Sequence, residues 1–243
     1  MPKTLTLDIG NSRLKAATFC GNEMLEAWTG DVEDLRRRLE REHFDACAVS
    51  LVGSEPEGLW KLLDGGCEKV LRVNGDTPAI LRNDYDYPAK LGADRWAAAV
   101  GAWKLYPNKT LLVVDAGTCI TCDIISSDGV FRGGVIAPGV GMRLQAMHSF
   151  TSGLPVVLPT ETPVKMDFPA RNTTNAMRQG AYLGTQLEIE GYVRLLIEQY
   201  KNLHVCLTGG TELTLAKDLG AEVSIDRHLV HIGLNEIISK YEK

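Results

Sequence analysis

A short strand-and-turn pattern occurs twice in this sequence, and it constrains the fold more than any other feature. Leu5–Ser12 reads LTLDIGNS and Leu112–Thr118 reads LVVDAGT, so that an apolar segment ends each time in Asp-x-Gly. Two further β-type segments follow each copy, separated by a turn at 21–22 in the first and at 128–129 in the second. This shared context indicates a duplicated lobe.

The repeated turn has the composition of a phosphate-binding loop. A strand brings Asp8 or Asp115 to its carboxyl end, and the following glycine lets backbone N–H groups approach phosphate oxygens. Asn11, Ser12 and Thr118 add short donors. Two such turns facing each other across a cleft would hold a polyphosphate, and their carboxylates would hold its cation. The competing interpretation is two buried strands with ordinary Asp-Gly-type turns, and the matching contexts favour phosphate binding.

Length and charge limit the remaining possibilities. The 243 residues suit two lobes, which we predict at 1–110 and 111–243. A net charge of −5 argues against binding to a nucleic acid backbone, and acidic residues surround the basic run Arg36–Arg38. The amino terminus leads directly into a strand, and no window is long and apolar enough to span a membrane. We therefore expect a cytoplasmic protein with no membrane partner.

The six cysteines are scattered among strand-like segments, as buried thiols of a reducing compartment often are. Cys119 and Cys122 form a C-x-x-C, but no second pair accompanies it. In a strand these two side chains would point to opposite faces, so zinc or redox use is not expected.

The first lobe reads as βββαβαβ, with a helix capped by Asp31. This order predicts a mixed five-stranded sheet flanked by helices, which resembles the ribonuclease H-like half of actin-like ATPases and sugar kinases. The fold class is therefore α/β, with two tandem lobes of this type and the active site in the cleft between them. The strands are predicted at 5–9, 14–20, 24–28, 46–52 and 69–73.

A second candidate site lies in the segment Tyr85–Trp103. The alanines of 97–103 predict a helix, so Gly92, Ala93, Asp94 and Arg95 lie at its amino terminus. Asp94 there could simply cap the helix. Capping does not account for Arg95, Tyr85 and Tyr87, which make a donor-rich aromatic rim suited to a small molecule with a carboxylate.

The second lobe adds glycine-rich turns and a long helix. Gly133, Gly134, Gly139 and Gly141 are predicted to punctuate a strand-to-helix turn, but neither a P-loop nor a dinucleotide fingerprint is present. The strand ending in 208–210 (Thr-Gly-Gly) is another place where a nucleotide could approach backbone. Residues 172–200 form the longest helical pattern. Its glycines 180 and 184 fit either a helix–helix or dimer contact or a glycine-weakened core helix.

Six blocks together resemble the type III pantothenate kinases of bacteria, members of the actin-like kinase superfamily. They fall in the family's order and spacing along nearly the whole chain, which makes the match specific. The blocks are DIGNSRLK (8–15), LGADRW (91–96), DAGTCIT (115–121), GGVIAPG (133–139), NTTNAMRQG (172–180) and LTGG (207–210). Ser12 replaces a usual Thr and Cys119 a common Ala, and neither change removes a needed donor or charge.

The resemblance implies phosphorylation of pantothenate by ATP with Mg²⁺, the first step of coenzyme A biosynthesis, by a homodimer that needs K⁺ or NH₄⁺. It implies that Asp94 is the catalytic base, Asp115 the ligand of the monovalent cation and Asp8 the residue near Mg²⁺. The implied ATP-binding residues are Asp8, Ile9, Gly10, Asn11, Ser12, Arg13, Leu14, Lys15 and Thr118. The implied pantothenate-binding residues are Tyr85, Gly92, Ala93, Asp94, Arg95 and Thr173, the last reaching across the dimer interface.

Two other functions remain open from the sequence. One is an accessory or regulatory member of the family without turnover, although Asp94 and Asp115 are both present. The other is a sugar kinase of the same superfamily, which would share the two Asp-x-Gly turns. A sugar kinase is not expected to carry the Tyr85 and Gly-x-Asp-Arg pocket.

Overall fold

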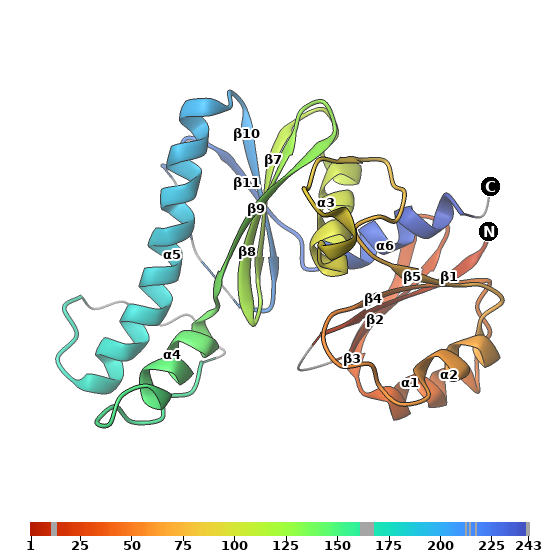
Figure 1. Ribbon diagram of the computed structural model, residues 1–243, viewed down its shortest axis with the longest axis horizontal. Coiled ribbons are helices and arrows are strands. Elements are labelled where there is room, and N and C mark those ends of the chain that lie inside the picture. Colours follow the sequence, from red (N-terminus) through yellow and green to blue (C-terminus); the bar gives the residue numbers. More distant parts are fainter. Residues whose placement is uncertain (11–13, 161–167, 212, 214, 217, 242–243) are drawn as a thin grey trace. The chain divides into compact units, whose positions relative to one another are not determined.

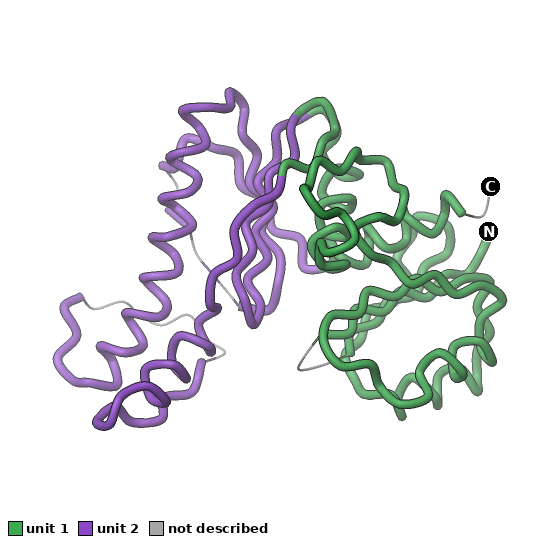
Figure 2. Tube along the Cα trace, viewed as in Figure 1, with its two compact units in different colours: residues 1–108, 127–132, 228–243 green, residues 109–126, 133–227 purple. Residues whose placement is uncertain are grey.

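The computed structural model describes residues 1–10, 14–160, 168–211, 213, 215–216 and 218–241. Contacts divide the chain into two compact units (Figure 2). Unit 1 comprises 1–108, 127–132 and 228–243, and unit 2 comprises 109–126 and 133–227. The predicted lobes 1–110 and 111–243 follow the duplicated sequence segments, and this boundary stays a prediction. The compact units are defined by contacts and place the last helix of the chain in unit 1.

Unit 1 contains the mixed five-stranded sheet that the sequence predicts. Its order is β3-β2-β1-β4-β5, with β1 antiparallel to β2 and parallel to β4. Because β4 and β5 are also parallel, the carboxyl ends of β1, β4 and β5 meet at one edge, beside the start of β2. The strands are β1 (Lys3–Ile9), β2 (Leu14–Cys20), β3 (Glu23–Gly30), β4 (Ala46–Leu51) and β5 (Val70–Val73).

Helices cover both faces of this sheet (Figure 1). On one face α1 (Val32–Leu39) and α2 (Leu59–Gly66) pack on alternate β1 side chains, with Leu5 and Leu7 in the core. On the other face lie α3 (Ala93–Leu105) and α6 (Leu229–Ser239). Since strand side chains alternate, Thr6 and Asp8 point toward the α3 and α6 side.

The amino terminus of α1 forms as predicted. Asp31 Oδ1 accepts from the Asp34 backbone N–H at 2.9 Å, and Asp34 Oδ2 accepts from the Asp31 N–H at 3.1 Å, which is a capping box. Each of the three arginines that follow pairs with a carboxylate. The basic run is therefore a solvated, neutralised helix face, as its acidic neighbours indicate.

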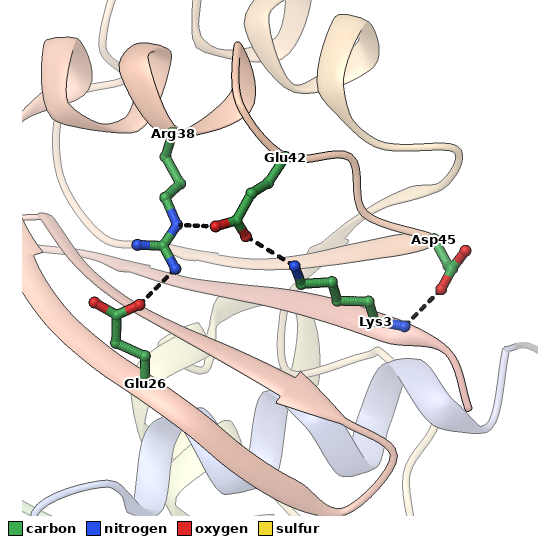
Figure 3. Close-up of polar contacts among 5 residues, drawn as sticks. All are labelled: Lys3, Glu26, Arg38, Glu42 and Asp45. Atoms are coloured by element: carbon green, nitrogen blue, oxygen red, sulfur yellow. Dashed lines mark hydrogen bonds and ion pairs between the residues drawn. The ribbon is translucent and has the colours of Figure 1, made fainter.

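Figure 3 shows how one of these arginines ties α1 to the sheet. Arg38 pairs with Glu26 of β3 and, through Nε at 3.3 Å, with Glu42. Glu42 in turn accepts from Lys3 Nζ of β1 at 2.9 Å, and the Lys3 backbone N–H donates to Asp45. These pairs are partly exposed, so we attribute little stability to each of them.

Helix α6 is held in unit 1 by close backbone contact with α3. A Cβ on Gly233 would meet the carbonyl of Ala97, and a Cβ on Gly101 would meet the carbonyl of Leu229, both well inside contact distance. The two glycines therefore let the helix axes approach more closely than any side chain would permit. This contact explains why the last segment of the chain belongs to unit 1.

Unit 2 is built around β7 (Thr110–Ala116), β8 (Cys119–Ser126), β9 (Val130–Pro138), β10 (Leu203–Gly209) and β11 (Glu222–Ile225). With the short β6 (Arg82–Asn83), the sheet has six strands in the order β11-β10-β7-β8-β9-β6, one more than the five predicted for each lobe, and β10 is parallel to both β7 and β11. The long helix α5 (Thr173–Gln199) packs on this sheet through Ile189 and Val193, and α4 (Val140–Ser149) packs on α5. The short β6 (Arg82–Asn83) pairs with the first two residues of β9, all within unit 1.

One prediction for unit 2 differs from the structure, and another begins outside the described residues. Gly133 and Gly134 lie inside β9 and not in a turn, because that strand continues to Pro138. A Cβ at Gly134 would meet Asp123 and its neighbouring carbonyl, so close strand approach explains this glycine. The helix predicted from Glu212 begins outside the described residues. No helix among the described residues is long and apolar enough to cross a membrane.

His231 of α6 is a buried titratable group beneath β1. Its Nδ1 lies 2.8 Å from Thr6 Oγ1, and its side chain is 4% exposed. Burial lowers the pKa of His231 to about 3, and the positive charges of His228 and Lys15 act in the same direction. The folded protein therefore holds this imidazole neutral.

We expect His231 to make stability pH-dependent. Below about pH 6.5 the unfolded chain takes up a proton on this residue and the folded chain does not, so stability falls as pH decreases from there toward 3. The slope from one such group approaches about 1.4 kcal/mol per pH unit. Urea unfolding of wild type and His231→Gln between pH 7.5 and pH 4.5 measures it. The variant should show a shallower decline, and an identical decline would contradict the assignment.

Candidate functional site

The first Asp-x-Gly turn places one acid between two neighbouring strands. Asp8 lies opposite Lys15 of β2 and Ser50 of β4 in the strand pairing. Lys15 Nζ is 3.8 Å from Asp8 Oδ2, and Ser50 Oγ donates to Asp8 Oδ1 at 3.3 Å. The Asp8 side chain is 14% exposed. A carboxylate is thus set at the carboxyl edge of the sheet with one donor toward each oxygen.

Opposing effects act on the charge of Asp8. Burial raises the pKa of Asp8, and the Asp94 carboxylate adds to the rise. Lys15 and the hydrogen bond from Ser50 act in the opposite direction, and burial remains the largest effect. Asp8 and Asp94 are therefore near enough to interact, although 86 positions separate them in sequence. A bound cation would relieve their repulsion.

Only part of the predicted ATP-binding segment 8–15 lies among the residues that the structure describes. Ile9 and Leu14 bury their side chains in the unit 1 core, so only their backbones face the turn. No described atom lies within 4 Å of a Cβ built on Gly10, which leaves open space there. Asn11, Ser12 and Arg13 lie outside the described residues.

The amino terminus of α3 carries the second predicted cluster. Gly92 is the N-cap and makes no side-chain capping bond, so Asp94 is not the N-cap residue. Asp94 lies in the first turn, where its Oδ1 accepts from the Arg95 backbone N–H at 2.8 Å. A Cβ at Gly92 would lie 2.6 Å from that same oxygen, so glycine makes room for the carboxylate. The helix dipole favours the negative charge at this position.

Arg95 is buried rather than part of an open rim. Its guanidinium lies 5.6 Å from the ring centroid of Tyr85 and 6.0 Å from that of Phe131, and the residue is 7% exposed. The two rings themselves lie 6.2 Å apart. Tyr85 thus belongs to an aromatic cluster around a cation, whereas Tyr87 is 70% exposed and stands apart from it.

The loop before α3 is tied down by polar contacts. Trp96 Nε1 donates to the Thr77 carbonyl at 3.0 Å, and Asn83 Nδ2 donates to the Gly75 carbonyl at 2.8 Å. The Tyr85 backbone N–H then donates to Asn83 Oδ1 at 3.0 Å. These bonds position Tyr85 beside the start of α3.

Backbone hydrogen bonds join the second Asp-x-Gly turn to two other turns. Asp115 is the last residue but one of β7 and lies beside Thr121 of β8 and Thr208 of β10. The Gly139 N–H donates to the Thr118 carbonyl at 3.0 Å, and the Gly210 N–H donates to the Ala116 carbonyl at 3.1 Å. The Thr-Gly-Gly turn and the turn before α4 therefore both meet the Asp115–Thr118 turn, within unit 2.

Thr173 is the first residue of α5. Asn172 caps this helix by accepting from the Asn175 N–H at 2.9 Å. No described atom other than the helix's own backbone lies within 4 Å of a Cβ built on Gly180, so no neighbouring backbone within the described chain explains that glycine.

Ser50 is a member of the site that sequence reasoning missed. It lies in the apolar strand β4 (ACAVSL), where its hydroxyl is the one polar side-chain group and does not by itself indicate a site. The pairing of β1 with β4 was needed to bring it to Asp8.

The sequence and the fold have close counterparts among known proteins. A family profile described as type III pantothenate kinase matches residues 4–195. A type III pantothenate kinase of Phocaeicola vulgatus is 36% identical over 98% of this chain and 99% of its own. A Campylobacter jejuni protein described as a conserved Baf family transcriptional activator superposes with a TM-score of 0.61 at 24% identity, over 98% of each chain. The activator of 2-hydroxyisocaproyl-CoA dehydratase of Clostridium difficile, solved with ADPNP, has a TM-score of 0.53 at 12% identity over 99% and 96%.

The packing of the second turn predicts the effect of a single methyl group. A Cβ at Gly139 would meet the carbonyls of Gly117 and Thr118 far inside contact distance, so Gly139→Ala must displace the turn. We expect it to lower the unfolding free energy by about 1–3 kcal/mol in urea titrations. Gly191→Ala on α5, where no described atom other than the helix's own backbone lies within 4 Å of the new Cβ, is the control and should stabilise by about 1 kcal/mol. Equal stability of Gly139→Ala and wild type would refute the crowding.

Proposed function

This chain belongs to the type III pantothenate kinase family and is a kinase that phosphorylates pantothenate, the first step of coenzyme A biosynthesis; we propose that Asp8 and Asp94 form the centre of its active site. One observation carries the proposal. Asp8 and Asp94 come from the separate blocks 8–15 and 91–96, and within unit 1 they lie near enough for the Asp94 charge to raise the pKa of Asp8. The comparisons lend no support to an accessory protein without turnover or to a sugar kinase.

Asp8 is the proposed residue for the divalent cation that accompanies ATP. The fit rests on the chemistry present: a mostly buried carboxylate, a second carboxylate nearby and a single lysine. The described residues contain no group of three or more metal-binding side chains. Mg²⁺ commonly binds through one or two carboxylates together with substrate phosphates, so this sparse donor set suits it. When bound, Mg²⁺ would neutralise charge on the phosphates.

The proposed ATP-binding residues come from both Asp-x-Gly segments. We assign residues 8–15 and Thr118 to ATP, because Lys15 supplies a positive charge and the glycine-lined turns supply backbone N–H groups. Residues 11–13 enter this assignment from the sequence alone.

Asp94 is the proposed base. Its Oδ1 is already held by the Arg95 N–H, which leaves Oδ2 to accept the hydroxyl proton of pantothenate. A carboxylate is a weak base for an alcohol, but a loose transition state requires little deprotonation before transfer. Asp94 would orient the hydroxyl and take its proton late in the transfer. The phosphoryl group passes from the β,γ-bridging oxygen of ATP to the hydroxyl oxygen, and ADP leaves.

Tyr85, Gly92, Ala93, Arg95 and Thr173 are the proposed pantothenate-binding residues. Pantothenate carries a carboxylate, and Arg95 contributes a buried positive charge beside two aromatic rings. Gly92 and Ala93 present backbone at the start of α3, next to Asp94.

Replacing the base tests the proposal directly. Asp94→Asn keeps the size of the side chain but cannot take the proton, so kcat should fall by at least about 10²-fold. ATP binding, followed by calorimetry, should stay close to wild type. Asp64→Asn removes an exposed carboxylate of α2 and is the matched control, with kcat unchanged. Near-normal turnover of Asp94→Asn would remove Asp94 from this role.

A monovalent cation, K⁺ or NH₄⁺, is proposed at Asp115. This carboxylate lies one residue before the end of β7, between two threonine-bearing strands and beside the backbone carbonyls of Ala116 and Thr118, and oxygens are the ligands that hard cations prefer.

Asp115→Asn should weaken activation by K⁺, because the site loses its charge. A K⁺ titration of turnover at constant ionic strength measures the shift, with Asp218→Asn as an exposed control in the same unit. Superimposable K⁺ titrations of wild type and Asp115→Asn would count against the site.

A homodimer is proposed from the surface of unit 2. Several large apolar side chains between residues 136 and 168 are exposed, among them Ile136 at 60%, Phe150 at 87% and Phe168 at 79%. Exposed apolar groups in this number favour burial against a partner, and Thr173 follows them directly in sequence.

A cytoplasmic location is also proposed, since the six cysteines are free, as a reducing compartment favours.

A further inference from the structure

Ser50 has a position that strand packing alone does not explain. It is 0% exposed, and in the parallel pair of β1 and β4 it lies directly beside Asp8. A serine that merely fills space in a strand commonly bonds a nearby backbone carbonyl. The Ser50 hydroxyl instead donates to the carboxylate oxygen Oδ1 of Asp8, at 3.3 Å.

The two oxygens of Asp8 have partners of different kinds. Oδ1 receives the Ser50 hydroxyl, and Oδ2 faces the ammonium of Lys15 at 3.8 Å. The Lys15 side chain is 50% exposed and long, so its ammonium can move away to a phosphate. The Ser50 side chain is short, has few rotatable bonds, and lies on a buried strand out of contact with water. Ser50 is therefore the fixed partner of the carboxylate, and Lys15 the adjustable one.

We propose that Ser50 is a positioning residue, whose hydroxyl orients the Asp8 carboxylate to receive the magnesium form of the nucleotide. The inference rests on the role proposed above for Asp8. It assigns to β4 a part in nucleotide binding that is separate from the Asp-x-Gly turn itself.

The charged groups around Asp8 are consistent with a role of Ser50 in holding its carboxylate. Asp8 is mostly buried and faces the like charge of Asp94, and both effects raise its pKa. The Ser50 bond favours the charged form, together with Lys15. A charged carboxylate held in one orientation needs less reorganisation when a cation arrives.

Two variants remove the strong donor. Ser50→Ala deletes the hydroxyl, and Ser50→Cys keeps nearly the same volume but offers only a weak S–H donor. Thr4→Val is the control, because Thr4 is a buried hydroxyl on the same face of β1, four positions before Asp8. Thermal melting of all three variants establishes that each is folded.

The readout is binding of a non-hydrolysable ATP analogue by calorimetry, with Mg²⁺ and with EDTA, in the absence of pantothenate. We expect both Ser50 variants to bind the Mg²⁺ form about tenfold more weakly, since a hydrogen bond to a charged group is lost. Binding in EDTA should be unchanged, and Thr4→Val should match wild type in both conditions. In turnover assays the KM for Mg-ATP should rise while the KM for pantothenate stays constant.

Several results would overturn the inference. One is wild-type affinity for the Mg²⁺ form in Ser50→Cys, or in a folded Ser50→Ala. Another is an equal loss with and without Mg²⁺, which would indicate a general distortion of the turn. A third is an equal loss in Thr4→Val. Failure of wild type to phosphorylate pantothenate would instead reject the proposed active site, and the calorimetry would still report on Ser50.

Discussion

The close contact between α3 and α6 is the constraint on which the proposed active site depends. Asp94 lies near enough to raise the pKa of Asp8 because α3 packs on the same face of the unit 1 sheet, and α3 packs closely against α6. Gly101 and Gly233 make this contact possible, since a methyl group at either would strike the backbone of the other helix. The last helix of the chain thus supports a residue far away in sequence.

The two Asp-x-Gly turns share a sequence pattern but differ in how they are held. Asp8 has side-chain partners on both sides, Ser50 and Lys15, and it is mostly withdrawn from water. Backbone hydrogen bonds to the carbonyls of Thr118 and Ala116 contribute to holding the turn after Asp115.

Much of unit 1 could be predicted from the sequence, because its signals are local. The strands alternate or run apolar, and Asp31 followed by acidic residues marks the start of α1. Sequence reasoning failed where a residue depends on its neighbour across a strand. Ser50 looked like part of an apolar strand, and Gly134 looked like a turn, until the strand pairing placed each beside an aspartate. Arg95 was expected in a donor-rich aromatic rim and lies buried beside two rings, and only tertiary packing decides that burial.

The most direct test is ADP release by the wild-type protein with Mg-ATP, comparing pantothenate with a panel of sugars, each in K⁺ and in Na⁺. The account predicts turnover that requires pantothenate and is much faster in K⁺. It would be contradicted if folded protein released no ADP with pantothenate, or if a sugar served as the better acceptor.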